Sequence, residues 1–113
     1  MNNLENRCLQ FAIDIRLTLK KLPRNISNNE DSKQVVRSSA SIGSNYIEAN
    51  ESLGDKDKLF RLRIARKESK ETSYWLAILL KTNPEFVTEL QNLMKEAEEL
   101  KKIISAIILK LDK

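Results

Sequence analysis

The segment from Ser38 to Ala49 is rich in small side chains, and it narrowly limits how this chain can fold. Ser38, Ser39, Ala40, Ser41, Gly43 and Ser44 all lie in it, within a stretch that has helical spacing. A glycine inside a helix costs about 1 kcal/mol relative to alanine, so we expect Gly43 where another backbone comes close. The segment therefore predicts a helix that packs tightly against a neighbour.

Composition favours one soluble, helix-rich domain over residues 1–113. Only 2 Gly and 2 Pro are present, and 41% of residues are hydrophobic while 32% are charged. Histidine is absent, which excludes Ser/His and Cys/His catalysis and the common zinc sites. The single cysteine, Cys8, excludes an internal disulfide and fits a reducing cytoplasm. No secretory signal or apolar run of membrane-spanning length is evident, so we expect a cytoplasmic location and no membrane association.

Four segments have the apolar periodicity of amphipathic helices, at about 3–21, 30–53, 55–81 and 84–112. The third has an inward stripe of Leu62, Ala65, Ser69, Thr72, Leu76 and Leu79. The fourth has a seam of Leu90, Leu93, Ala97, Leu100, Ile104, Ile107 and Leu111. Short connectors favour antiparallel neighbours, so the fold class is all-α, an antiparallel up-down-up-down four-helix bundle.

Local signals place the helix boundaries. Pro23 should stop the first helix, and residues 25–29 read as a polar connector. Gly54 reads as the C-terminal cap of the second helix and Asp55 as the N-cap of the third. Asn83 is the expected N-cap of the fourth helix, with Pro84 at its first position.

The second and fourth helices have apolar faces wider than one intramolecular partner requires. Val36, Ala40, Gly43 and Ile47 widen the second, and Met94, Ile103 and Ile108 widen the fourth. Monomers rarely expose large apolar patches, so these faces predict contact with another subunit.

A basic stretch runs from Lys56 to Lys70, with seven cationic and two acidic residues. Five of the cations fall within about 100° of the helical wheel; they are Lys56, Arg63, Arg66, Lys67 and Lys70. A one-sided basic face is the electrostatic pattern expected for phosphate contact, although an ordinary solvated helix face has the same pattern. No glycine-rich phosphate loop, groove-reading motif or aromatic stacking platform accompanies it.

Carboxylates recur three residues apart in Glu48–Glu51, Glu68–Glu71 and Glu96–Glu99. Without histidine we expect no metal or other cofactor at these pairs. Glu68 instead predicts a partly buried ion pair with Arg61.

A polar stripe follows one face of the second helix, through Arg37, Ser41, Ser44 and Glu48. It fits either a solvent-exposed face or a hydrogen-bonded seam in which Arg37 meets a carboxylate in bidentate geometry.

Two motifs resemble a known family. They are Arg-Ser-Ser-x-Ser-Ile-Gly-Ser-Asn-Tyr-Ile-Glu-Ala from Arg37, and Leu-x-Ile-Ala-x-Lys-Glu-x-x-Glu-Thr-x-x-Trp-Leu from Leu62. The chain resembles the "four helix bundle protein" family, also called the 23S ribosomal RNA intervening-sequence protein family. The matching motif positions are Arg37, Asn45, Glu48, Glu68, Glu71 and Trp75. The resemblance implies no catalytic role for them.

That family is similar to the accessory protein of diversity-generating retroelements. The resemblance implies a barrel-like homopentamer that works with a reverse transcriptase and with RNA or DNA. We therefore expect a non-enzymatic ring-like homo-oligomer that binds nucleic acid, or a nucleic-acid-handling partner, through its basic face. The alternative is a protein–protein assembly scaffold with no nucleic-acid role. A carboxylate metal hydrolase or nuclease is a third hypothesis, and a metal assay would test it.

Overall fold

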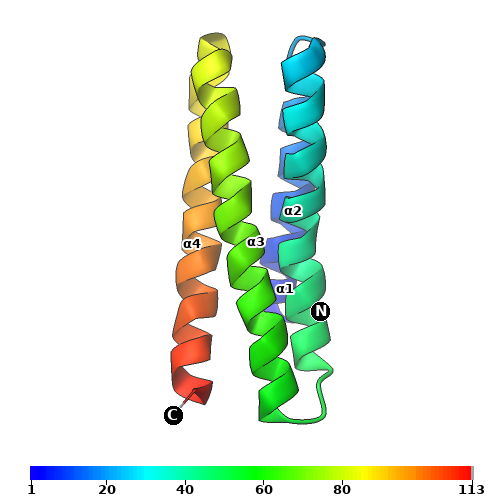
Figure 1. Ribbon diagram of the computed structural model, residues 1–113, viewed down its shortest axis with the longest axis vertical. Helices are drawn as coiled ribbons and strands as arrows, with labels where there is room; N and C mark the ends of the chain where they lie inside the picture. The colour runs from blue at the N-terminus through cyan, green and yellow to red at the C-terminus, as the bar shows by residue number, and fades with distance from the viewer. Residues whose placement is uncertain (113) are drawn as a thin grey trace.

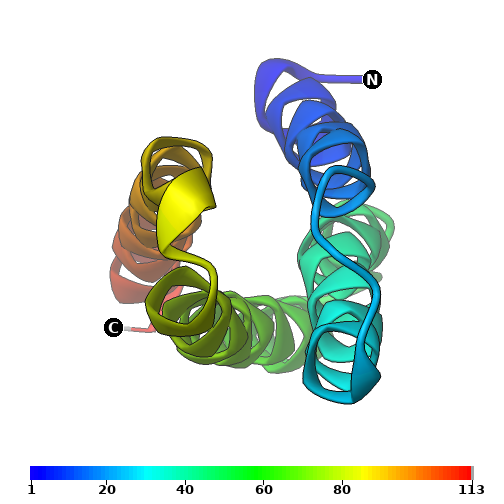
Figure 2. The same cartoon turned by 90° about the horizontal axis from the view of Figure 1, so that it is seen from above.

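Residues 1–112, which the computed structural model describes, form four α-helices and one 3-10 turn. The elements are α1 (Asn3–Leu19), α2 (Ile26–Asn50), α3 (Asp55–Thr82), η1 (Pro84–Phe86) and α4 (Val87–Leu111) (Figure 1). Consecutive helices run antiparallel and pack side by side, and α1 and α4 face each other across the remaining side (Figure 2), where they also make contact. The predicted all-α class is confirmed. Lys113, at the end of the predicted domain, lies outside the described residues.

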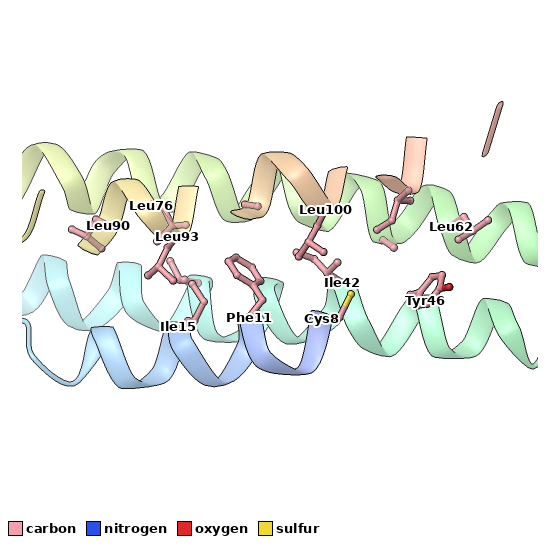
Figure 3. Packing of buried hydrophobic residues seen from close by; sticks show 14 of the residues in the cluster. Cys8, Phe11, Ile15, Ile42, Tyr46, Leu62, Leu76, Leu90, Leu93 and Leu100 are labelled. Carbon is pink, nitrogen blue, oxygen red and sulfur yellow. The ribbon is translucent and has the colours of Figure 1, made fainter. Parts of the chain in front are cut away.

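A single apolar core runs along the bundle between the two helix pairs. Phe11 and Ile15 of α1 point toward Leu93 and Leu100 of α4 (Figure 3). All six residues of the predicted α3 stripe are buried. The predicted α4 seam is buried through Ile104, after which Ile108 takes the core position and Ile107 is half-buried.

The small-residue segment packs against α1. A Cβ atom added to Gly43 would lie 2.9 Å from the Cβ atom of Cys8, closer than real Cβ contacts allow. The predicted tight contact is therefore confirmed, and α1 is its partner. Cys8 is itself buried, as are Ser38 and Ser39 on the same segment of α2.

The start of α2 differs from the prediction, because residues 26–29 are helical and do not form a connector. The Asn25 side chain accepts a hydrogen bond of 2.8 Å from the Asn28 backbone N–H, which caps the helix four residues earlier than predicted. Asn28 is buried because its side-chain amide exchanges hydrogen bonds of 2.8 and 2.9 Å with the amide of Asn83. Asn28 can therefore be buried, although it is polar, because its hydrogen-bond partner lies 55 positions away in the sequence.

The other predicted boundaries need three corrections. α2 ends at Asn50 and not near 53, and Gly54 is the extended N-cap residue of α3 and does not cap α2. Asp55 is therefore in the first turn of α3, where its charge suits the helix dipole. Asn83 makes no side-chain cap, because its amide is used by Asn28, and Pro84 opens η1 before α4 begins at Val87.

Candidate nucleic-acid interface

The outward face of α3 carries the predicted basic residues, because burial of Leu62, Ala65 and Leu76 turns the opposite side to solvent. Lys56, Lys67 and Lys70 are exposed, whereas Arg66 is half-buried. Arg63 is exposed but forms an ion pair of 2.8 Å with Asp112, just beyond α4. The structure thus places four of the five predicted cations on an exposed surface. One of these four, Arg63, is paired with a carboxylate.

Two aromatic side chains lie on the same face, and sequence reasoning missed them. Phe60 is 57% exposed and Tyr74 is 61% exposed. Phe60, Lys67 and Tyr74 are each seven residues apart, so they follow one line along α3. That spacing was the signal that could have found them. The basic face is therefore interleaved with aromatic rings, a combination typical of surfaces that bind single-stranded nucleic acid.

Beside this face, α2 and α3 enclose a shallow groove of about 490 Å³. Its lining consists of Gln34, Arg37, Lys67, Lys70, Glu71, Tyr74 and Trp75. The rings of Tyr74 and Trp75 meet edge to face, with centroids 5.2 Å apart and planes at 76°. Trp75 is half-buried and packs against the core, so it anchors the aromatic end of the groove.

Arg37, which lines the groove, joins α2 to α3. Its Nη1 lies 3.2 Å from Oε2 of Glu68, and its Nη2 lies 3.1 Å from Oε2 of Glu71. The hydrogen bond with Glu71, together with the charge of Glu68, raises the pKa of Arg37. The guanidinium therefore remains charged, and the two carboxylates are held by one cation.

The predicted ion pair between Arg61 and Glu68 is wrong. Seven residues of helix span about 10 Å along its axis. Arg37 reaches Glu68 directly from the neighbouring helix, and the Arg61 guanidinium lies 5.8 Å from the ring centroid of Phe60.

The polar stripe on α2 combines both predicted alternatives. Arg37 belongs to an interhelical seam, although it contacts two carboxylates and does not make a bidentate pair with one. Ser44 and Glu48 are exposed. Asn45 donates hydrogen bonds to the Ser41 carbonyl and hydroxyl oxygens, 2.9 and 3.0 Å away, so it stabilises α2 internally.

A second, larger groove of about 1060 Å³ lies between the end of α1 and the start of α2. Arg16, Lys20, Arg24, Lys33 and Arg37 are the cations that line it. Arg37 borders both grooves, so a row of cations continues from α3 across α2 toward α1; in it Arg37 is paired with Glu68 and Glu71, and Lys33 with Glu30. The sequence did not reveal this continuation, because these residues are spread over two helices and form no charge run.

Within residues 1–112, no three His, Cys, Asp or Glu side chains gather in a way that could hold a metal ion. Over the same residues, no helix is both long and apolar enough to cross a membrane. Every buried side-chain nitrogen or oxygen in this part of the chain has a hydrogen-bond partner.

Comparisons with known proteins agree with this architecture. A crystal structure of a protein with unknown function from the S23 ribosomal protein family of Bacteroides thetaiotaomicron has a TM-score of 0.82 and 30% sequence identity. The match covers 93% of this chain and 97% of that one. No curated protein matches the chain. A family model described as 23S rRNA-intervening sequence protein matches residues 2–106. The chain therefore belongs to the 23S rRNA-intervening sequence protein family.

Proposed function

We propose that this protein is a non-enzymatic nucleic-acid-binding module whose α3 face contacts phosphate groups. The observation that carries the proposal is the exposed line of Lys56, Lys67 and Lys70, interleaved with Phe60 and Tyr74. Lysines supply phosphate contacts that do not depend on base sequence, and exposed rings supply stacking surfaces. A net charge of +4 favours association with a polyanion.

A salt titration tests this proposal. Labelled structured RNA and single-stranded DNA are titrated by fluorescence anisotropy at about 50 and about 200 mM salt. Three phosphate contacts, one for each lysine, predict affinity roughly 20- to 40-fold lower at the higher salt concentration. The triple variant Lys56→Gln/Lys67→Gln/Lys70→Gln should bind at least about tenfold more weakly and with a shallower salt dependence.

The chain offers a matched control in three exposed lysines of α4. Lys95→Gln/Lys102→Gln/Lys110→Gln changes the net charge by the same amount on a different helix. If both triple variants lose affinity equally, general charge and not the α3 face explains binding. If the wild-type protein binds neither ligand at low salt, the proposed function is wrong.

We also propose that the bundle assembles into a homopentamer. Support comes from Leu9, Ile13 and Leu17, which lie along the outer side of α1 and are 48%, 40% and 53% exposed. They recur every four residues, opposite the buried Cys8, Phe11 and Ile15. On the helices predicted to have wide apolar faces, Ile47 and Leu109 are exposed as well. A second subunit would remove this apolar surface from water.

This apolar surface also favours the second candidate function, a protein-assembly scaffold with no nucleic-acid role. Light scattering coupled to size-exclusion chromatography measures the subunit number, and Leu9→Gln/Ile13→Gln/Leu17→Gln should lower it. A wild-type monomer at micromolar concentration would contradict the proposed assembly. A ring that binds neither RNA nor DNA would favour the scaffold.

A further inference from the structure

We infer that the groove between α2 and α3 is a subsite for one unpaired base of a single-stranded nucleic acid, with the base against Tyr74 and a flanking phosphate on Lys67 and Lys70. This inference rests on the proposed function and names the form of nucleic acid that the same face selects. It is argued from the aromatic side chains, the cations and the dimensions of the groove.

The aromatic end of the groove is exposed and supported. Tyr74 is 61% exposed, so one face of its ring is open to a ligand. Its edge-to-face contact with Trp75, which packs on the core, limits the orientations of the ring. A preoriented exposed ring loses little conformational entropy when a base stacks on it.

The cations of the groove lie within one or two helical turns of this ring. Lys67 and Lys70 precede Tyr74 by seven and four residues, so all three follow one side of α3. Within residues 1–112, neither lysine forms a salt bridge. Glu71, the carboxylate that lines the groove, is paired with Arg37 at 3.1 Å. The lysines are therefore free to meet a phosphate, and Glu71 is held by Arg37, which it shares with Glu68.

The groove has the size and polarity for a nucleotide. Its volume of about 490 Å³ lies within the range of roughly 300–1,000 Å³ typical of small-ligand sites. Gln34 adds an amide that can both donate and accept hydrogen bonds at a base edge. Bases in a duplex are already stacked on their neighbours, so only an unpaired base can offer its face to Tyr74. Phosphate contacts alone would not distinguish single strands from duplexes.

Trp75 allows the groove to be observed directly, because it is the single tryptophan of the chain. An oligothymidylate of about 12 nucleotides, long enough for one such site, is titrated while tryptophan fluorescence is recorded. A blunt duplex of about 20 base pairs is titrated in parallel by anisotropy. We expect the single strand to change Trp75 emission and the duplex to leave it nearly unchanged.

Variants then separate stacking from charge. Tyr74→Ala should weaken oligothymidylate binding by about 5- to 100-fold, the effect of losing one base–aromatic stack, and change duplex binding less than about twofold. Tyr74→Phe keeps the ring and should bind within about threefold of wild type. Lys67→Gln/Lys70→Gln should weaken both ligands. Phe60→Ala removes a similarly exposed ring of the same face that does not line the groove, so it should keep the Trp75 emission change at saturating oligothymidylate, whereas Tyr74→Ala should lose it. Circular dichroism verifies that each variant folds.

The possible failures are distinguishable. If the wild-type protein binds neither ligand at low salt, both the proposed function and this inference are wrong. If it binds both ligands but Tyr74→Ala has no selective effect, or Phe60→Ala abolishes the Trp75 emission change equally, the proposed function stands and the subsite is wrong. Equal quenching of Trp75 by polyglutamate would also overturn the subsite, because the groove would then recognise negative charge without a base.

Discussion

The contact between α2 and α3 and the contact between α1 and α4 both contain an arginine–glutamate pair, but in different surroundings. Between α2 and α3, Arg37 holds Glu68, whose side chain is only 8% exposed. The polar contact continues through the buried Ser38 and Thr72 hydroxyls, which are 2.8 Å apart. Between α1 and α4, Arg7 makes two hydrogen bonds of 2.7 and 2.8 Å with Glu96, both on the surface.

This difference indicates that the α2–α3 contact and the α1–α4 contact are specified in different ways. A buried carboxylate has to meet its cation, so the α2–α3 register is tied to particular residues of both helices. The α1–α4 contact is less close and consists of apolar side chains with one exposed ion pair, which is worth little in water. The family motifs of α2 and α3, which include Arg37, Glu68 and Glu71, therefore coincide with the contact that depends on specific polar partners.

The largest losses of stability should come from substitutions in the core, and they should be similar on α1 and on α3. Phe11 on α1 and Leu76 on α3 are both almost fully buried. Phe11→Ala and Leu76→Ala should each lower the free energy of unfolding by about 2–5 kcal/mol, through lost burial and the cavity left behind. Urea denaturation measures both losses. If one variant lost several times more stability than the other, the apolar packing of α1 and that of α3 would already differ.

The next largest loss of stability should distinguish the α2–α3 contact from the α1–α4 contact. Arg37→Ala should cost about 1–3 kcal/mol, less than for a fully buried pair, because the arginine side chain is itself 55% exposed. Much of that cost is the uncompensated charge of Glu68, so adding Glu68→Gln should restore part of the lost stability. Absence of any restoration in the double variant would show that the buried charge is not the cause. Urea denaturation of the two single variants and the double variant provides the measurement.

The dependence of stability on alkaline pH tests how apolar the surroundings of Cys8 on α1 are. Burial is the largest cause that raises the pKa of the Cys8 thiol, from 9.0 to about 11. Between those values the unfolded chain loses the thiol proton and the folded protein keeps it, so stability falls as pH rises. The wild-type protein should therefore lose up to about 1–2 kcal/mol more than Cys8→Ala across this interval. Parallel pH profiles of the two proteins would contradict the burial of this thiol.

The smallest effect should come from the surface pair of α1 and α4. Arg7→Ala should cost less than about 1 kcal/mol, and the cost should shrink at about 1 M salt because exposed charges are screened. Adding Glu96→Gln to Arg7→Ala should restore nothing, in contrast to the Arg37 pair. Urea denaturation at low and high salt measures both expectations, and a salt-independent loss above that of Arg37→Ala would reverse the comparison.

Predictions that rested on periodicity succeeded. The inward stripe of α3 and most of the α4 seam could be read because apolar side chains repeat with the pitch of a helix. Gly43 signalled a close contact because glycine is costly inside a helix. Predictions that rested on partners failed more often. Asn28 looked like a loop residue until Asn83 was found beside it, and Glu68 was assigned to Arg61 when its cation lies on another helix.

The candidate site shows the same division. The lysines and arginines of α3 were visible in the sequence as a charge run on one helix face. The groove and the row of cations that continues past Arg37 depend on how α1, α2 and α3 lie together.

The sequence by itself determined that this protein is a set of amphipathic helices, which faces of those helices are buried, and where a small-residue segment lets two helices approach. These properties follow from the repeat of side chains along one helix, which needs no knowledge of the neighbours. Only the tertiary structure decided which polar groups pair across helices and which surface groups share a groove. Such contacts join residues tens of positions apart, so their distances are set by packing and not by local spacing.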